Sequence, residues 1–173
     1  MRNKISVIGL GNILLQDEGV GVHTVRALKR DFDFPEQVTL IDGGTLGLDL
    51  LPYVEGMEKV LFIDALELQK EPGTIAVLED GEIPATLRPA FSFHQVGLAD
   101  LLFASTFMGI NPPKTALIGI QPERIETGLA LSETLEKNFG KLLQTILEKL
   151  REWGVAFTEK STREHADVPG HSI

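Results

Sequence analysis

Two carboxylates and one imidazole occupy positions in this sequence that favour chemistry. Glu18 follows the apolar segment 4–10 after a glycine-rich stretch, Asp64 stands near the end of segment 59–65, and His94 precedes a helical segment. In an open α/β sheet, ligands bind beyond the carboxyl ends of the parallel strands. We therefore expect Glu18, Asp64 and His94 to meet at one edge of such a sheet.

This set of side chains suits either a divalent cation or acid–base catalysis. Oxygen and nitrogen ligands fit first-row metals such as nickel or zinc, and Glu18 or Asp64 has the chemistry of a general base toward water. Asp64 ends an apolar run, where an unpaired carboxylate costs several kcal/mol to desolvate. Chain position predicts a three-residue site and leaves both chemistries open.

Several common catalytic motifs are absent. The sequence has no cysteine, no His-Glu-x-x-His helix and no Gly-x-Ser-x-Gly turn, which argues against thiol, zincin and serine-hydrolase chemistry of those types. Gly9 and Gly11 begin like a dinucleotide fingerprint, but Leu14 stands where its third glycine belongs. Nucleotide binding is therefore disfavoured.

Apolar periodicity predicts the elements that position these side chains. Five compact, β-branched segments indicate strands, at 4–10, 38–42, 59–65, 74–78 and 115–120. Helices are expected over 19–30, after an N-cap at Thr45, from His94 to Phe107, and from a cap at Ser132 to Gly154. Pro52 should end or kink the second of them, and Asp17 is expected to cap the first.

The order of these elements predicts an α/β fold. We expect a single three-layer α/β/α domain over residues 1–157, with helices on both faces of a five-stranded, mostly parallel mixed sheet. Only about eight residues join segments 59–65 and 74–78, too few for a parallel crossover. Segment 74–78 should therefore run antiparallel to 59–65. Residues 158–173 are polar and are predicted to form a flexible tail.

Composition narrows the choice of partners. The formal net charge is −9, which opposes nonspecific binding to nucleic acid or to anionic membranes. No apolar run reaches the roughly 18 residues of a membrane helix, and no signal peptide is recognisable at the amino terminus. Together with the absence of cysteine, this favours a cytoplasmic protein, and we expect a monomer.

Five blocks of the sequence resemble the nickel–iron hydrogenase maturation endopeptidases, and they occur in the order typical of that family. The blocks are VIGLGNILLQDEGVG (7–21), DGGT (42–45), FIDA (62–65), HQVGLAD (94–100) and IGIQPE (118–123). The resemblance covers roughly residues 4–153. It implies an endopeptidase that removes the C-terminal extension of a hydrogenase large-subunit precursor after nickel has been inserted.

The resemblance also assigns roles to residues. It implies that Glu18, Asp64 and His94 are the metal ligands and, as an overlapping set, the catalytic residues. The nickel would arrive with the substrate, although zinc or cadmium could occupy the same ligands. Asp42, Gly43, Gly44 and Thr45 would lie beside the site and contact the substrate peptide. The family is grouped with aspartic-type peptidases, so carboxylate-based and metal-assisted hydrolysis both stay open.

Two alternative functions deserve comparison. A peptidyl-tRNA hydrolase shares the Gly-Leu-Gly-Asn strand end but usually continues with Pro-Gly, whereas Ile13-Leu14 follows here and the charge opposes RNA binding. A non-catalytic chaperone for the nickel-loaded subunit would use the same residues as a protease. Sequence alone does not separate the chaperone from the enzyme.

Overall fold

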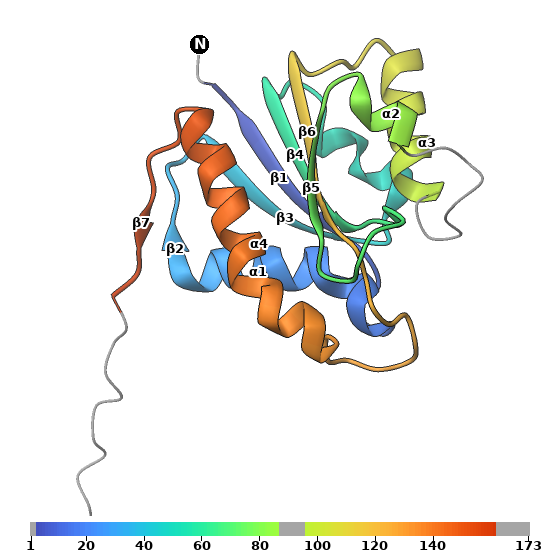
Figure 1. Cartoon of the computed structure of the whole chain (residues 1–173). Helices are drawn as coiled ribbons and strands as arrows, with labels where there is room; N and C mark the ends of the chain where they lie inside the picture. Colours follow the sequence, from blue (N-terminus) through green and yellow to red (C-terminus); the bar gives the residue numbers. More distant parts are fainter. Residues whose placement is uncertain (1–2, 87–95, 162–173) are drawn as a thin grey trace, which may run out of the picture.

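A five-stranded mixed sheet lies at the centre of the computed structural model, which describes residues 3–86 and 96–161 (Figure 1). The strands are β1 (Ile5–Leu10), β2 (Phe32–Asp33), β3 (Val38–Gly44), β4 (Lys59–Ala65), β5 (Ile75–Glu79), β6 (Lys114–Ile120) and β7 (Thr158–Glu159). The helices are η1 (Gln16–Gly19), α1 (Val20–Asp31), η2 (Gly47–Tyr53), α2 (Glu82–Thr86), α3 (Val96–Phe107) and α4 (Glu133–Glu152), where η denotes a 3₁₀ helix. The predicted α/β class is confirmed.

The sheet has the strand order β3-β1-β4-β6-β5. The first four strands are parallel, and β5 is antiparallel to its neighbour β6. Segment 74–78 was expected to oppose 59–65, and its direction is as predicted. Its hydrogen-bonding partner is different, because β6 lies between β4 and β5.

Helices cover both faces of the sheet and create two apolar cores. On one face, α1 and α4 contribute Val25, Leu28, Leu142 and Ile146 to a core with β1, β4 and β6. On the other face, η2 and α3 pack through Leu50 and Leu101 against Phe62 of β4. Figure 1 shows α1 and α4 on one side of the strands and α2 and α3 on the other. The three-layer arrangement is therefore as predicted.

The helix ends agree with the sequence at α4 and differ at η2. Ser132 caps α4, since its Oγ accepts a hydrogen bond from Leu135 N at 3.3 Å, and Gly154 follows the helix with φ +81°. Thr45 does not cap the second helix. That helix is a 3₁₀ helix that begins at Gly47 after Leu46 and has no side-chain cap. It contains Pro52 and ends at the next residue.

The C-terminal polar segment begins with ordered structure. Thr158 and Glu159 form β7, which pairs antiparallel with β2. The rings of Phe32, Phe34 and Phe157 pack together beside this ladder, with centroids 5.5–6.3 Å apart. Thr158 and Glu159 belong to the segment expected as a flexible tail, 158–173, most of which, 162–173, lies outside the described residues. No helix of the described part is long and apolar enough to cross a membrane.

Candidate active site

Asp64 reaches the sheet edge at the end of a strand that is buried from Val60 onward. β4 lies between β1 and β6, and Asp64 pairs in register with Gly119 of β6. Only 6% of Asp64 is exposed, and its Oδ1 accepts a hydrogen bond from Ala65 N at 2.8 Å. An apolar strand thus holds this carboxyl group in a nearly dry position at the carboxyl edge of the sheet.

Glu18 reaches the same edge because the chain folds back after β1. Gly11 turns with φ +116°, and a Cβ atom there would collide with the Glu18 carbonyl. Gly11 N also donates to Gly44 O at 2.9 Å, which ties the ends of β1 and β3 together. Glu18 then lies in η1 and is 7% exposed. The predicted strand-to-helix turn is therefore what brings this carboxylate inward.

Asp17 fixes the loop that carries Glu18, and it does so differently from the capping expected. Its Oδ2 accepts hydrogen bonds from Glu123 N (2.9 Å) and Arg124 N (2.8 Å), and its Oδ1 accepts one from Ser132 N. These donors belong to the connection between β6 and α4, not to α1. Asp17 is fully buried, and the three bonds join two loops that are more than 100 residues apart in the chain.

Glu18 and Asp64 line one cavity of about 120 Å³, here called the carboxylate cavity. Its other walls come from the strand ends β1 and β3 and from η2 and α3. They are Leu10, Gly11, Gly44, Thr45, Gly47, Leu50, Gly97, Leu98 and Leu101. Two acidic groups thus share a small space whose other walls, apart from Thr45, are leucine side chains and glycines.

Burial raises the pKa of Asp64 to about 8, and the negative charge of Glu18 adds to this rise. The hydrogen bond from Ala65 N favours the ionised form and opposes the shift only in part. Asp64 therefore carries a proton at neutral pH unless a cation compensates its charge. A bound cation would displace this proton and hold both carboxylates in the ionised form.

The third predicted ligand, His94, lies outside the described residues. Within residues 3–86 and 96–161, no three His, Cys, Asp or Glu side chains form a group that could hold a metal ion. The structure thus brings two of the three predicted residues together. Buried carboxylate oxygens are hard ligands that fit a divalent cation, and a site of two such groups has room for ligands from elsewhere.

The predicted substrate loop divides between two cavities. Gly44 and Thr45 line the carboxylate cavity, as their place in the motif suggested. Asp42 lines a neighbouring cavity of about 300 Å³, which Gly44 and Thr45 also border. There its Oδ2 accepts hydrogen bonds from Arg26 Nε (3.0 Å) and Nη2 (2.8 Å). Gly43 is buried in the sheet and lines neither cavity.

Comparison with known proteins shows the family. A model of the hydrogenase maturation protease family matches residues 22–149. The hydrogenase 2 maturation protease of Escherichia coli K12 is 41% identical over 153 residues, which cover 88% of this chain and 93% of the relative. The chain belongs to the hydrogenase maturation protease family. Its relatives include HupD of Rhizobium leguminosarum, 39% identical over 96% of this chain and 82% of the relative.

Solved structures of maturation proteases have the same fold. The E. coli endopeptidase HybD superimposes with a TM-score of 0.86 at 39% identity, covering 91% of this chain and 98% of that one. HybD from Thermococcus kodakarensis gives a TM-score of 0.69 at 26% identity, with 85% and 98% covered. This chain is thus a hydrolase of the endopeptidase type.

Sequence reasoning missed the apolar walls of this maturation protease's cavity. Leu50, Leu98 and Leu101 come from η2 and α3, where they read as ordinary core positions. Their periodicity indicates which face of a helix is buried but not that the buried face borders a site. The glycines Gly47 and Gly97 were a usable signal, because paired glycines on facing elements permit close backbone approach.

Proposed function

We propose that this maturation protease removes the C-terminal extension of a nickel-loaded hydrogenase large-subunit precursor. The observation that carries the proposal is the placement of Glu18 and Asp64 in one buried cavity at the carboxyl edge of the sheet. Buried carboxyl groups with shifted pKa values cluster at catalytic sites, and a carboxylate can act as the general base toward the water that attacks a peptide bond. The names of the relatives are consistent with a hydrogenase precursor as partner.

The nickel ion belongs to the substrate in this proposal. Glu18, Asp64 and His94 are the residues that would bind it, with oxygen and nitrogen donors only, since the chain has no cysteine. Such donors bind nickel less tightly than thiolates do, so the ion can remain with the precursor after cleavage. Zinc or cadmium in solution would compete for the same ligands. Recognition of a substrate-bound cation would hold the scissile bond beside the carboxylates and so supply proximity.

The proton on Asp64 suggests how the carboxylates share the work. In the resting site, burial and the charge of Glu18 raise the pKa of Asp64 to about 8, so Asp64 is protonated at neutral pH. Arrival of the cation would release that proton and leave two carboxylates, one of which can take a proton from the attacking water. An aspartic-type route and a metal-assisted route both satisfy this description.

We also propose that the enzyme works as a cytoplasmic monomer, on a protein and not on nucleic acid or membrane.

The decisive experiment compares nickel-loaded and nickel-free precursor. Purified protease is incubated with each form, and the C-terminal mass of the large subunit is measured over time. We expect cleavage of the loaded form alone. Equal cleavage of both forms would refute recognition through nickel, and cleavage of neither would favour a non-catalytic chaperone.

Variants test the site in the same assay. Glu18→Gln and His94→Ala should each abolish processing and leave the fold intact, since the first removes a carboxylate charge and the second an imidazole nitrogen that would bind the cation. Glu133→Gln is the matched control, because Glu133 is exposed on α4, where it pairs with Lys137 at 2.6 Å. Wild-type rates in both site variants would show that the assignment is wrong.

A further inference from the structure

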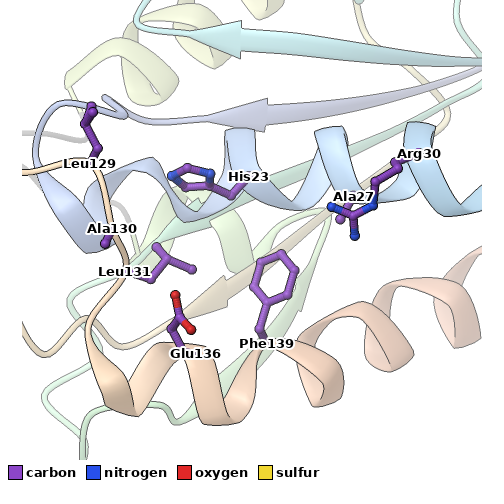
Figure 2. A pocket seen from close by; sticks show the side chains of 8 residues that line it. All are labelled: His23, Ala27, Arg30, Leu129, Ala130, Leu131, Glu136 and Phe139. Atoms are coloured by element: carbon purple, nitrogen blue, oxygen red, sulfur yellow. The ribbon is translucent and has the colours of Figure 1, made fainter. Parts of the chain in front are cut away.

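A second cavity lies on the opposite face of the sheet from η2 and α3. It has a volume of about 310 Å³ and is bordered by α1, the start of α4 and residues 129–131. Figure 2 shows the ring of His23 directed from α1 toward residues 129–131, while Glu136 and Phe139 rise from α4 toward α1. We call it the His23 pocket. None of its lining residues borders the carboxylate cavity.

His23 places a ring nitrogen without a hydrogen-bond partner among the described residues in the wall of this pocket. Burial and the nearby charge of Arg26 lower the pKa of His23, while Asp42 and Glu136 oppose the shift, so the ring is neutral at pH 7. A neutral imidazole has one N–H to donate and one ring nitrogen that accepts. His23 Nε2 is buried and has no hydrogen-bond partner among the described residues. An incoming donor would satisfy it.

The charges around the pocket favour a cation. Arg30 donates to both carboxylate oxygens of Asp31, at 2.6 and 2.7 Å, and Arg26 is paired with Asp42. Both guanidinium groups near the pocket thus already have a carboxylate partner. No lysine or arginine of the described residues pairs with Glu136 in the same way. Glu136 is therefore the charged side chain of the pocket without an ion pair among the described residues.

The remaining walls suit an aliphatic stem. Ala27, Leu131 and Phe139 line the pocket between its polar groups, and long basic side chains commonly lay their methylene groups on such surfaces. We propose that the His23 pocket binds an arginine or lysine side chain of the hydrogenase precursor. Its head would donate to His23 Nε2 and pair with Glu136, while its stem packs on Leu131 and Phe139. This inference rests on the proposed function for the identity of the partner.

The pocket is connected to the loop of Glu18 through the chain. Leu129 follows Gly128, whose N donates to Leu14 O and whose O accepts from Gln16 N, both at 2.9 Å. Asp17 binds the same connection at both of its ends. A side chain held against residues 129–131 therefore rests on a wall that is fixed directly to η1. The precursor would be anchored on one side of α1 and cut on the other.

Pocket chemistry is tested first with small probes. N-acetyl-L-arginine methylamide and N-acetyl-L-lysine methylamide are titrated into the full chain, and the ring signals of the four histidines are followed by NMR. His23→Phe assigns the signal of His23. We expect the two cationic probes to shift it and the uncharged N-acetyl-L-norleucine methylamide to leave it unchanged. Equal shifts with all three, or none, would overturn the inference.

Processing of the nickel-loaded precursor then tests the source of the basic side chain. Glu136→Gln should raise KM about tenfold with kcat unchanged, because the lost charge-assisted contact serves binding and not chemistry. Glu133→Gln, with the same charge change one turn away and outside the pocket, should leave KM at the wild-type value. Equal KM values for the two variants would refute the inference. Probe binding without any precursor cleavage by the wild type would refute the proposed function instead.

Discussion

At the level of single residues, Asp64 shows a conflict between folding and function. In the unfolded chain its carboxyl group ionises near pH 3.8, whereas in the folded protein its pKa rises to about 8. Between these values the folded state holds one proton more than the unfolded state. The free energy of unfolding therefore falls as pH rises from about 4 to 8, by roughly 1.4 kcal/mol per pH unit at most.

Asp64→Asn should remove this cost while abolishing processing. Asparagine keeps an oxygen to accept from Ala65 N, carries no charge, and loses the carboxylate that a cation requires. We expect the variant to be more stable than the wild type by about 2–4 kcal/mol at pH 8 and by almost nothing at pH 4. Denaturant unfolding at both pH values measures the difference. A gain that is equal at the two values would contradict a titration origin.

The same scale separates what the sequence can predict from what it cannot. Glu18 and Asp64 were identifiable because strand ends converge at one edge, and the structure places both in one cavity. The role of Asp17 was not identifiable, since its partners Glu123, Arg124 and Ser132 are distant in the chain and donate through backbone N–H groups. Every residue except proline has a backbone N–H, so the sequence does not indicate which of these groups will donate to Asp17.

Among the elements, α1 is the one whose packing positions the site. It follows η1 directly, and its Gly21 lies against the backbone of β1 and β4, where a Cβ atom would collide with the carbonyls of Ile63 and Leu10. Only glycine allows this approach. Displacing the start of α1 would displace Glu18, which is three residues earlier in the chain.

Gly21→Ala should therefore destabilise the protein and impair processing even where it stays folded. We expect a loss of about 2–4 kcal/mol, since backbone atoms cannot move aside as a side chain can. Gly140→Ala is the matched control in α4, where no described atom outside the helix's own backbone lies within 4 Å of the new Cβ. It should gain about 0.5–1 kcal/mol from helix propensity. Thermal unfolding compares the two variants, and similar melting temperatures would disprove the close-packing argument.

The ends of helices and strands could be predicted from local sequence more readily than the pairing of strands. Segment 59–65 coincides with β4, and Ser132 and Gly154 mark α4 as expected, because apolar period and caps are local signals. The strand that pairs with β5 could not be predicted from local sequence. It is β6, which begins 35 residues after the end of β5 and lies between β4 and β5. The two-residue ladder of β2 and β7 is too short to leave any pattern.

At the scale of the whole molecule, the carboxylate cavity is remote from the two-stranded ladder of β2 and β7. The cavity is formed by strand ends, η1, η2 and α3, whereas β7 runs beside β2 at the far end of α1, on the side of Figure 1 away from α3. Lys160 N donates to Asp31 O and its Nζ to Lys29 O, both at 2.8 Å. These contacts hold the end of α1 and touch neither Glu18 nor Asp64.

Two shortened chains test this separation. A chain that ends at residue 161 retains β7, Lys160 and the aromatic group of Phe32, Phe34 and Phe157, and we expect wild-type stability and processing. A chain that ends at residue 156 loses Phe157, β7 and Lys160. The rings of Phe32 and Phe34 then become exposed to solvent. Its melting temperature should fall by roughly 5–10 °C, the equivalent of about 2–3 kcal/mol.

At a temperature where both chains remain folded, the shorter chain should process nickel-loaded precursor at the wild-type rate. The lost contacts stabilise the end of α1 that is remote from η1, so they contribute to unfolding free energy without shaping the cavity. Circular dichroism establishes the folded range, and the C-terminal mass assay gives the rate within it. A folded chain ending at 156 that processes slowly would show instead that the ladder positions Glu18 through the whole length of α1.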